Sequence, residues 1–142
     1  MIDLSVFVEH PPAVAWRALT EPELIARWLS PTVGFEPTVG TTFIVQVAVP
    51  DKPNAEMACQ VVAASEPDHL AYSWTDLRGD PPQRWIMDYR LSPHGRGTRL
   101  FWRMSGFDIK DRHQKFARNG IERSWNRVLL PKFADLVKTM GT

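Results

Sequence analysis

The sequence predicts an α+β fold in which a long C-terminal helix covers one face of a twisted six-stranded antiparallel sheet. Short runs of alternating apolar and polar residues recur through the first three quarters of the chain, and their spacing is typical of an antiparallel meander. The final segment instead repeats its apolar residues at three- and four-residue steps, as an amphipathic helix does. A sheet with one apolar face needs a cover, and only this helix is long enough to provide it.

The chain begins with a strand, because apolar residues alternate with mostly polar ones over residues 2–8. Pro11-Pro12 ends the strand, and a short helix follows through Ala13–Leu19, since proline is tolerated in a first helical turn. Thr20-Glu21-Pro22-Glu23 resembles a capping box with the threonine as the cap. This pattern predicts a second short helix that ends near Trp28, before the next proline.

Five further strands are predicted from the same alternation. They cover Phe43–Val49, Met57–Ala63, Leu70–Trp74, Trp85–Leu91 and Leu100–Met104. Turn residues separate them at Pro50 to Asn54, Asp80-Pro81-Pro82 and His94-Gly95-Arg96-Gly97. Consecutive strands joined by short turns should pair as neighbours. The first strand should either return beside the last strands or pair across to the second.

The last segment, from about Asp111 to Met140, is predicted to be helical. Asp111 and Gln114 have the spacing of a capping box. The apolar stripe consists of Ile121, Trp125, Val128, Leu129, Phe133, Leu136, Val137 and Met140. Pro131 interrupts the segment because it lacks a backbone donor and crowds the preceding turn, so we expect a kink between Arg127 and Pro131.

The whole-chain numbers favour one globular domain over residues 1–142, since domains typically hold about 100–200 residues. The net charge of +1 is too small to indicate a nucleic-acid or anionic-membrane partner. Cys59 is the only cysteine, which excludes an intramolecular disulfide. The N-terminus lacks the pattern of a signal peptide, and no apolar run is long enough for a membrane span. We therefore expect a cytoplasmic protein.

Several residue blocks, which together cover nearly the whole chain, carry a resemblance to a known family. They are Pro12-x-x-x-Trp16-x-Ala18-Leu19-Thr20-x-Pro22-Glu23-Leu24 with Trp28, Phe35-x-Pro37-x-Val39-Gly40-x-x-Phe43, Glu66-Pro67 with Leu70-x-Tyr72-x-Trp74, Thr98-x-Leu100, and Trp125 with Leu129. The chain resembles the activator-of-heat-shock-protein-90 ATPase homologues within the START-like (SRPBCC) superfamily. The resemblance implies a helix-grip fold, in which the curved six-stranded antiparallel sheet wraps around the long C-terminal helix. It also implies a cavity between sheet and helix that holds apolar or aromatic molecules.

Ten residues are predicted to bind such a ligand, because strand alternation or the helix stripe turns them toward the covered face. They are Trp28, Phe43, Tyr72, Trp74, Trp85, Met87, Tyr89, Trp102, Met104 and Trp125. Indole N–H and tyrosine hydroxyl groups would orient the ligand. Trp28 and the loop at Phe35 would lie near the cavity mouth. The alternative is that these rings only fill the core.

The sequence suggests no catalytic residue, metal site or cofactor. His10, His69, His94 and His113 lack ligand spacing. Cys59 is interpreted as a small buried apolar side chain. Asp88 should point outward and pair with Arg99 or Arg103 on the neighbouring strand.

The leading functional hypothesis is therefore a binding protein for a small hydrophobic or aromatic molecule. Two alternatives remain: a cyclase- or hydrolase-type enzyme that uses the same cavity, and a chaperone-regulating interaction domain. The basic side chains of the last helix should form a solvated face, although Arg118 or Arg123 could instead engage an anionic group or partner. A homodimer through a strand edge is a further hypothesis.

Overall fold

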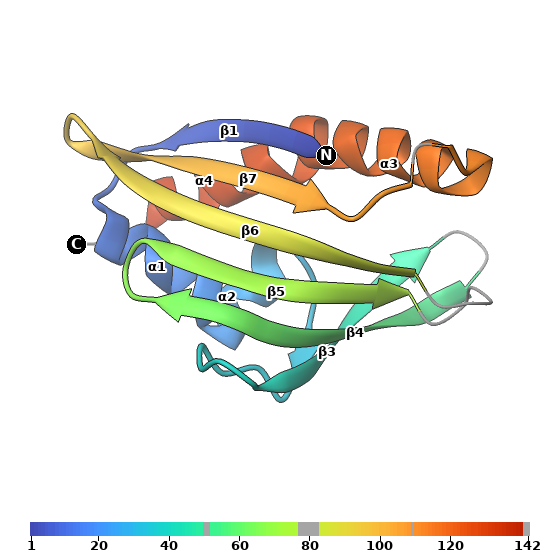
Figure 1. Ribbon diagram of the computed structural model, residues 1–142. Helices are drawn as coiled ribbons and strands as arrows, with labels where there is room; N and C mark the ends of the chain where they lie inside the picture. Colours follow the sequence, from blue (N-terminus) through green and yellow to red (C-terminus); the bar gives the residue numbers. More distant parts are fainter. Residues whose placement is uncertain (50–51, 77–82, 109, 141–142) are drawn as a thin grey trace.

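The computed structural model describes residues 1–49, 52–76, 83–108 and 110–140. Its elements, in chain order, are β1 (Ile2–Val8), α1 (Pro12–Thr20), α2 (Pro22–Trp28), β2 (Thr32–Val33), β3 (Thr42–Val49), β4 (Lys52–Ser65), β5 (His69–Asp76), β6 (Gln83–His94), β7 (Gly97–Ser105), α3 (Arg112–Ser124), the π-helical turn η1 (Trp125–Leu129) and α4 (Leu130–Thr139). The helices lie on one face of a curved antiparallel sheet (Figure 1). The predicted α+β fold is confirmed.

The strand order is β1-β7-β6-β5-β4-β3-β2. The strands from β3 to β7 form the predicted meander, and β1 returns beside β7, with Ile2 opposite Met104. The strand beyond the six predicted ones is β2, which pairs with β3 and is only two residues long. Such a short strand cannot show an alternating pattern.

One predicted turn is shorter than expected, and another cannot be compared. The structure begins β4 at Lys52, so the prediction of a turn through Asn54 is wrong. The strand continues into this segment because its backbone pairs with β3, with Lys52 opposite Val49. Asp80-Pro81-Pro82 lies outside the described residues.

Thr20 does not cap α2. It is the last residue of α1, and its hydroxyl donates a hydrogen bond of 2.8 Å to the carbonyl of Trp16. The N-cap of α2 is Glu21, which makes no side-chain capping bond. The predicted cap is wrong because a threonine hydroxyl can bond the carbonyl four residues earlier in its own helix.

Asp111 caps α3 as predicted. Its carboxylate accepts from the backbone N–H groups of His113 and Gln114 at 2.8 and 3.4 Å. Gln114 does not complete the capping box, because its side-chain carbonyl accepts from the backbone N–H of Asp108 instead. Both side chains therefore hold the start of α3 against the segment that precedes it.

The long helix changes its geometry at the predicted place. The backbone N–H of Leu130 donates to the carbonyl of Trp125, five residues earlier, where an α-helix would bond four residues earlier. Pro131 explains the change, because it has no N–H to donate and its ring would crowd the carbonyl of Arg127 in a regular helix. The expected kink therefore takes the form of a π-helical turn.

This turn shifts the face that the helix buries. The buried positions are Trp125, Leu130, Phe133 and Val137, so the first step spans five residues. Val128, which a three- and four-residue period places on the buried stripe, is 49% exposed. Its prediction as a stripe residue is wrong because the π-helical turn adds one residue to the period.

The two halves of the long helix pack differently. The C-terminal half, α4, buries Leu130, Phe133 and Val137 and contacts β1, α1 and α2. The N-terminal half, α3, has no buried residue, and its Ala117 and Ile121 are only partly buried against the core. The sheet therefore holds α4 firmly and α3 through partly buried side chains.

This difference predicts unequal effects of the same substitution in the two halves. Phe133 is fully buried and packs edge-on against Trp28 at 5.1 Å. Phe133→Ala should lower the free energy of unfolding by about 3–5 kcal/mol because it leaves a cavity. Phe116→Ala is the matched control on α3, where the ring is 78% exposed, and should change it by about 0.5 kcal/mol or less. Urea denaturation measures both, and similar losses would contradict the packing described.

Candidate functional site

The ten predicted ligand-binding residues gather on the inner face of the sheet or on the helices that cover it. Cross-strand register places Phe43, Trp74 and Trp85 in one row across β3 to β6. All ten are buried, and Trp74 is the most exposed at 8%. They are Trp28, Phe43, Tyr72, Trp74, Trp85, Met87, Tyr89, Trp102, Met104 and Trp125. The structure thus brings the predicted set together in one interior.

Around α4 and η1 these rings pack directly against one another. Trp102 on β7 stacks on Trp125 of η1 with ring centroids 4.1 Å apart and planes 15° from parallel. Trp28 lies edge-on to Trp125 at 5.8 Å and donates its indole N–H to the carbonyl of Ala18 at 2.8 Å. This part of the interior is a close-packed core that joins the sheet to three helical segments.

Trp28 and Phe35 do not flank an opening. Trp28 is 2% exposed and Phe35 is 7% exposed, and Phe35 packs edge-on against Phe43 at 4.9 Å. Their predicted place at a cavity mouth is wrong because both rings pack inward onto the core.

The interior changes character at the end of the sheet where β5 ends, β6 begins and the chain leaves β7 for α3 (Figure 1). Trp74 and Trp85 lie opposite each other on β5 and β6. Trp85 stacks on the partly buried Phe107 at 4.9 Å, in the segment that leads from β7 to α3. Trp74 makes no ring contact with any other aromatic side chain in the described part of the chain. This end of the aromatic row is less fully surrounded by other rings.

Gly106 allows the backbone to pass close to Trp85. Its φ of +102° lies in a region that L side chains rarely adopt, and a Cβ there would lie 3.2 Å from the carbonyl oxygen of Arg84. The backbone at Gly106 therefore brings Phe107 onto the Trp85 ring where β7 ends.

The tyrosines of the inner face form a short hydrogen-bonded chain. The hydroxyl oxygens of Tyr72 and Tyr89 are 2.7 Å apart, and Tyr89 donates to Sδ of Met87 at 3.7 Å, so Tyr72 donates to Tyr89. Burial raises the pKa of Tyr72 well above its ordinary value and raises the pKa of Tyr89 as well. Both side chains are therefore neutral phenols.

Cys59 is confirmed as a small buried side chain. It is 4% exposed, and burial raises the pKa of its thiol to about 12. A cysteine acts as a nucleophile through its thiolate, which is scarce at neutral pH when the pKa is this high. The geometry does not support a catalytic role for Cys59.

One indole donor of the inner face lacks a partner. Nε1 of Trp85 is buried and has no hydrogen-bond partner among the described residues, whereas the indole of Trp102 interacts with the hydroxyl of Tyr89, although outside ideal hydrogen-bond geometry. A buried donor without an acceptor costs about 1–3 kcal/mol. The buried polar residues of the described chain are Thr20, Ser73 and Thr98, and none is charged. The interior is thus electrically neutral and holds an unpaired donor at Trp85.

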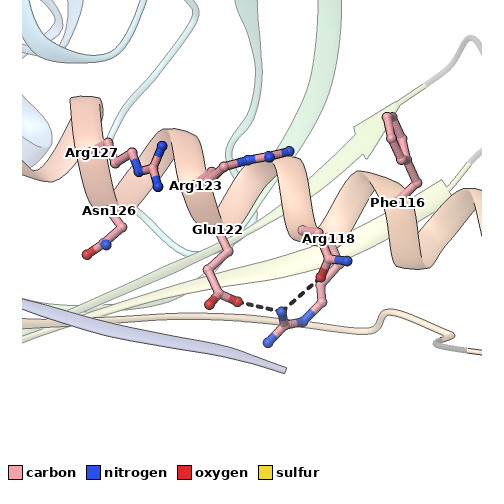
Figure 2. Close-up of a pocket in the computed structure, with 7 residues that line it drawn as sticks. Phe116, Arg118, Glu122, Arg123, Asn126 and Arg127 are labelled. Carbon is pink, nitrogen blue, oxygen red and sulfur yellow. Dashed lines mark hydrogen bonds and ion pairs between the residues drawn. The ribbon is translucent and has the colours of Figure 1, made fainter.

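A hollow of about 480 Å³ lies on the exposed side of the long helix; we call it the helix hollow. Its lining comes from Phe116, Arg118, Asn119, Glu122, Arg123, Asn126 and Arg127. Figure 2 shows Arg118 turned toward Glu122, with which it forms an ion pair. Arg118 also donates to the carbonyl of Met1 at 3.2 Å. Arg123 and Arg127 have no ion-pair partner in the described part of the chain.

A second hollow, of about 440 Å³, lies along the outer face of β3 to β6; we call it the sheet hollow. Its lining comes from Val33, Thr42, Phe43, Ile44, Ala58, Cys59, Gln60, Ser73, Thr75 and Arg84. Most of these positions alternate with the inner row, so they share the opposite face. Phe43 is the only predicted ligand-binding residue in this lining, so the sheet hollow is not the aromatic site that the sequence predicts.

Asp88 lies on the outer face as predicted, but its partners differ from those expected. Its carboxylate contacts Nε2 of His69 at 2.8 Å and Nε of Arg90 at 3.2 Å. Arg103, which is opposite Asp88 in register, instead pairs with Asp3 on β1 at 3.4 Å. The predicted pairing is wrong because β1 offers Arg103 a carboxylate on its other side. Arg99 likewise turns to β1 and donates to Ser5 Oγ.

The sequence profile described as Activator of Hsp90 ATPase homolog 1-like protein matches residues 9–136. The chain belongs to this family. No curated protein matches the sequence. None of the helices in the described residues combines the length and the apolar character that crossing a membrane requires.

Solved structures agree with this assignment. Protein MLL2253 from Mesorhizobium loti is 29% identical, with a TM-score of 0.85 over 99% of this chain and 98% of that one. The Aha1 dimer from Colwellia psychrerythraea is 12% identical, with a TM-score of 0.79 over 97% and 96%. CalU16 from Micromonospora echinospora is 18% identical, with a TM-score of 0.75 over 96% and 75%. At these identities the last two show a shared fold alone.

Sequence reasoning missed two features of the site. Phe107 covers Trp85, although it follows the last strand and lies outside any alternating run; the neighbouring Gly106 was the available signal. Arg127 joins Arg123 in the helix hollow, and their four-residue spacing on a helix was visible in the sequence.

The buried thiol of Cys59 and the buried phenol of Tyr72 predict that the folded protein loses stability at alkaline pH. In the unfolded chain Cys59 and Tyr72 ionise around their ordinary pKa values of 9.0 and 10.0, whereas burial keeps both protonated in the folded state. Above about pH 9 the folded state binds more protons than the unfolded state, so the free energy of unfolding falls as pH rises. Thermal unfolding between about pH 8 and 11 measures this. Tyr72→Phe removes one titrating group and should make the pH dependence shallower; an unchanged slope would refute the explanation.

Proposed function

We propose that the protein binds a small apolar or aromatic molecule between α3 and the inner face of the sheet, beside Trp74 and Trp85. The observation that carries the proposal is the absence of any buried residue in α3, in contrast to α4. A helix that served only to close the core would be expected to bury an apolar stripe along its whole length. A guest between α3 and the sheet would bury the partly exposed Ala117 and Ile121 of α3 further.

The wall offered to such a guest suits an aromatic ligand. Trp74 and Trp85 present large ring faces, and aromatic pairs contribute about 0.5–1.5 kcal/mol beyond the area they bury. Met87 and Met104 lie on the same face, and methionine adapts to guests of varied shape. Because α3 is held by partly buried side chains, its displacement to admit a ligand should cost less than displacing α4.

Binding is favoured over catalysis by the ionisable groups in this interior. Proton-transfer catalysis works best with a group whose pKa lies near the operating pH. The buried ionisable side chains of the described chain are Cys59, Tyr72 and Tyr89, and burial raises the pKa of each. None of them favours the cyclase- or hydrolase-type alternative.

Ligand binding can be tested by thermal unfolding with a panel of planar aromatic compounds. A compound that binds only the folded state raises the melting temperature as its concentration rises. Trp74→Ala should weaken binding of such a compound about tenfold, because it removes one ring of the wall. Phe116→Ala removes a ring from the exposed side of α3 and should leave the affinity unchanged. Equal weakening by both variants, or no shift with any compound, would refute the proposal.

An interaction domain is the second candidate function, and the helix hollow favours it. Residues 112–139 carry seven Lys and Arg side chains against two acidic ones, although the whole chain has a net charge of only +1. Arg123 and Arg127 project from consecutive turns and have no ion-pair partner among the residues that the structure describes, and Phe116 on the same helix is 78% exposed. Arginine and aromatic residues dominate binding energy at protein interfaces. An acidic segment of a partner protein fits this combination.

A peptide of four glutamates around one phenylalanine provides a direct test. Arg123→Glu with Arg127→Glu should abolish its binding, measured by fluorescence anisotropy of the labelled peptide at low salt. Lys132→Glu with Lys138→Glu makes the same change of net charge outside the helix hollow and should retain most of the binding. Equal loss of peptide binding in both double variants would show that the overall charge of the protein explains the effect. That result would contradict a specific binding surface.

Two remaining features of the proposal concern assembly and location. The Colwellia psychrerythraea Aha1 protein is described as a dimer. By analogy with that fold, this chain could form a homodimer through one of its sheet edges, β1 or β2. A cytoplasmic location remains our prediction from the sequence.

A further inference from the structure

The inner face contains a hydrogen-bond donor that folding has buried without supplying an acceptor. Nε1 of Trp85 is shielded from solvent and unpartnered within the described chain, and the residue is only 4% exposed. More than 90% of buried polar groups in proteins are hydrogen-bonded, so an exception calls for a partner. The donor lies in the row that also holds Trp74, at the end of the sheet where the chain passes Gly106 on its way from β7 to α3.

The other indoles of the interior are less suited to meet a ligand. Trp28 already donates to the carbonyl of Ala18. Nε1 of Trp102 makes no hydrogen bond of ideal geometry in the described chain, but the indole interacts with the Tyr89 hydroxyl, and its fully buried ring stacks on Trp125 at 4.1 Å. Trp85 instead stacks on the partly buried Phe107, next to the start of α3. Of these indole donors, Trp85 is the one beside the proposed ligand.

The charge of the surroundings limits the ligand class further. No charged side chain is among the buried residues of the described chain. Tyr72, Tyr89 and Cys59 are neutral, since burial raises the pKa of each. An ionised ligand would lose its hydration here without meeting an opposite charge, which is strongly unfavourable. A neutral acceptor such as a carbonyl or ether oxygen loses little hydration and gains the indole N–H.

We propose that the ligand is a neutral planar aromatic molecule that carries a carbonyl-type oxygen, and that Trp85 Nε1 donates a hydrogen bond to that oxygen. This inference depends on the proposed ligand site and adds the chemical class of the ligand. The Trp85 ring is the flat wall on which the aromatic body lies beside Trp74, and its N–H fixes the orientation of the oxygen.

Fluorenone and fluorene form a matched pair of probes, because they share a flat three-ring frame and differ in one carbonyl group. Fluorenone should bind the wild-type protein about tenfold more tightly, as expected when a buried donor gains an acceptor. In Trp85→Phe the preference should fall to about one, while fluorene retains its affinity within a few fold. Equilibrium dialysis gives each dissociation constant. Fluorene carboxylate should bind more weakly than either neutral probe.

Each outcome separates this inference from the proposed function. Equal wild-type affinity for fluorenone and fluorene would overturn the inference while leaving an apolar site in place. A preference that persists in Trp85→Phe, or that Trp102→Phe abolishes instead, would overturn the assignment to Trp85. Tighter binding of fluorene carboxylate would overturn the neutral class. Absence of binding by every probe would count against the ligand site itself. The wild-type comparison needs no variant, so a folding defect in Trp85→Phe would not prevent the test.

Discussion

The stack of Trp102 on Trp125 is the contact on which the rest of the architecture depends. It joins the second strand from one edge of the sheet to the middle of the long helix, with rings 4.1 Å apart and nearly parallel. Trp28 packs edge-on against Trp125 at the side of this stack, and its indole N–H donates a hydrogen bond to the carbonyl of Ala18 on α1. Sheet, long helix and both short helices therefore meet at one set of indoles.

The π-helical turn that carries Trp125 explains why the two halves of the long helix behave differently. Pro131 prevents a regular helix at this point, and the extra residue in the turn resets the buried face from Trp125 to Leu130. After the turn, α4 buries its stripe against β1 and the short helices. Before the turn, α3 buries nothing fully, so one continuous helix provides both an anchor and a more weakly held cover.

The two sides of the long helix differ in polarity and in charge. Its inner side faces a neutral interior of rings, thioethers and phenols, in which Nε1 of Trp85 lacks an acceptor among the described residues. Its exposed side carries a row of arginines and the exposed ring of Phe116, and among the described residues Glu122 is the acid that pairs with one of these arginines. An apolar ligand and an acidic partner would therefore use different faces of the same segment. The helix α3 would cover the ligand and also carries residues of the helix hollow. A ligand that displaces α3 would therefore also move the helix hollow.

The sequence by itself determined the fold class, every strand except the two-residue β2, and the residues of the inner face, because a period of two and a helical period are direct consequences of backbone geometry. It also located the break at Pro131, since the missing donor is visible in the residue type. Only the tertiary structure decided that the break is a π-helical turn that exposes Val128, that Trp28 and Phe35 pack inward, and that Arg103 prefers Asp3 to Asp88. These outcomes depend on which of several neighbours lies closest after the sheet curves and the helix docks. The periodicity of a sequence indicates which face of a helix or strand a side chain occupies. Hydrogen-bond and ion-pair partners, unpaired buried donors and hollows depend instead on contacts between segments far apart in the chain.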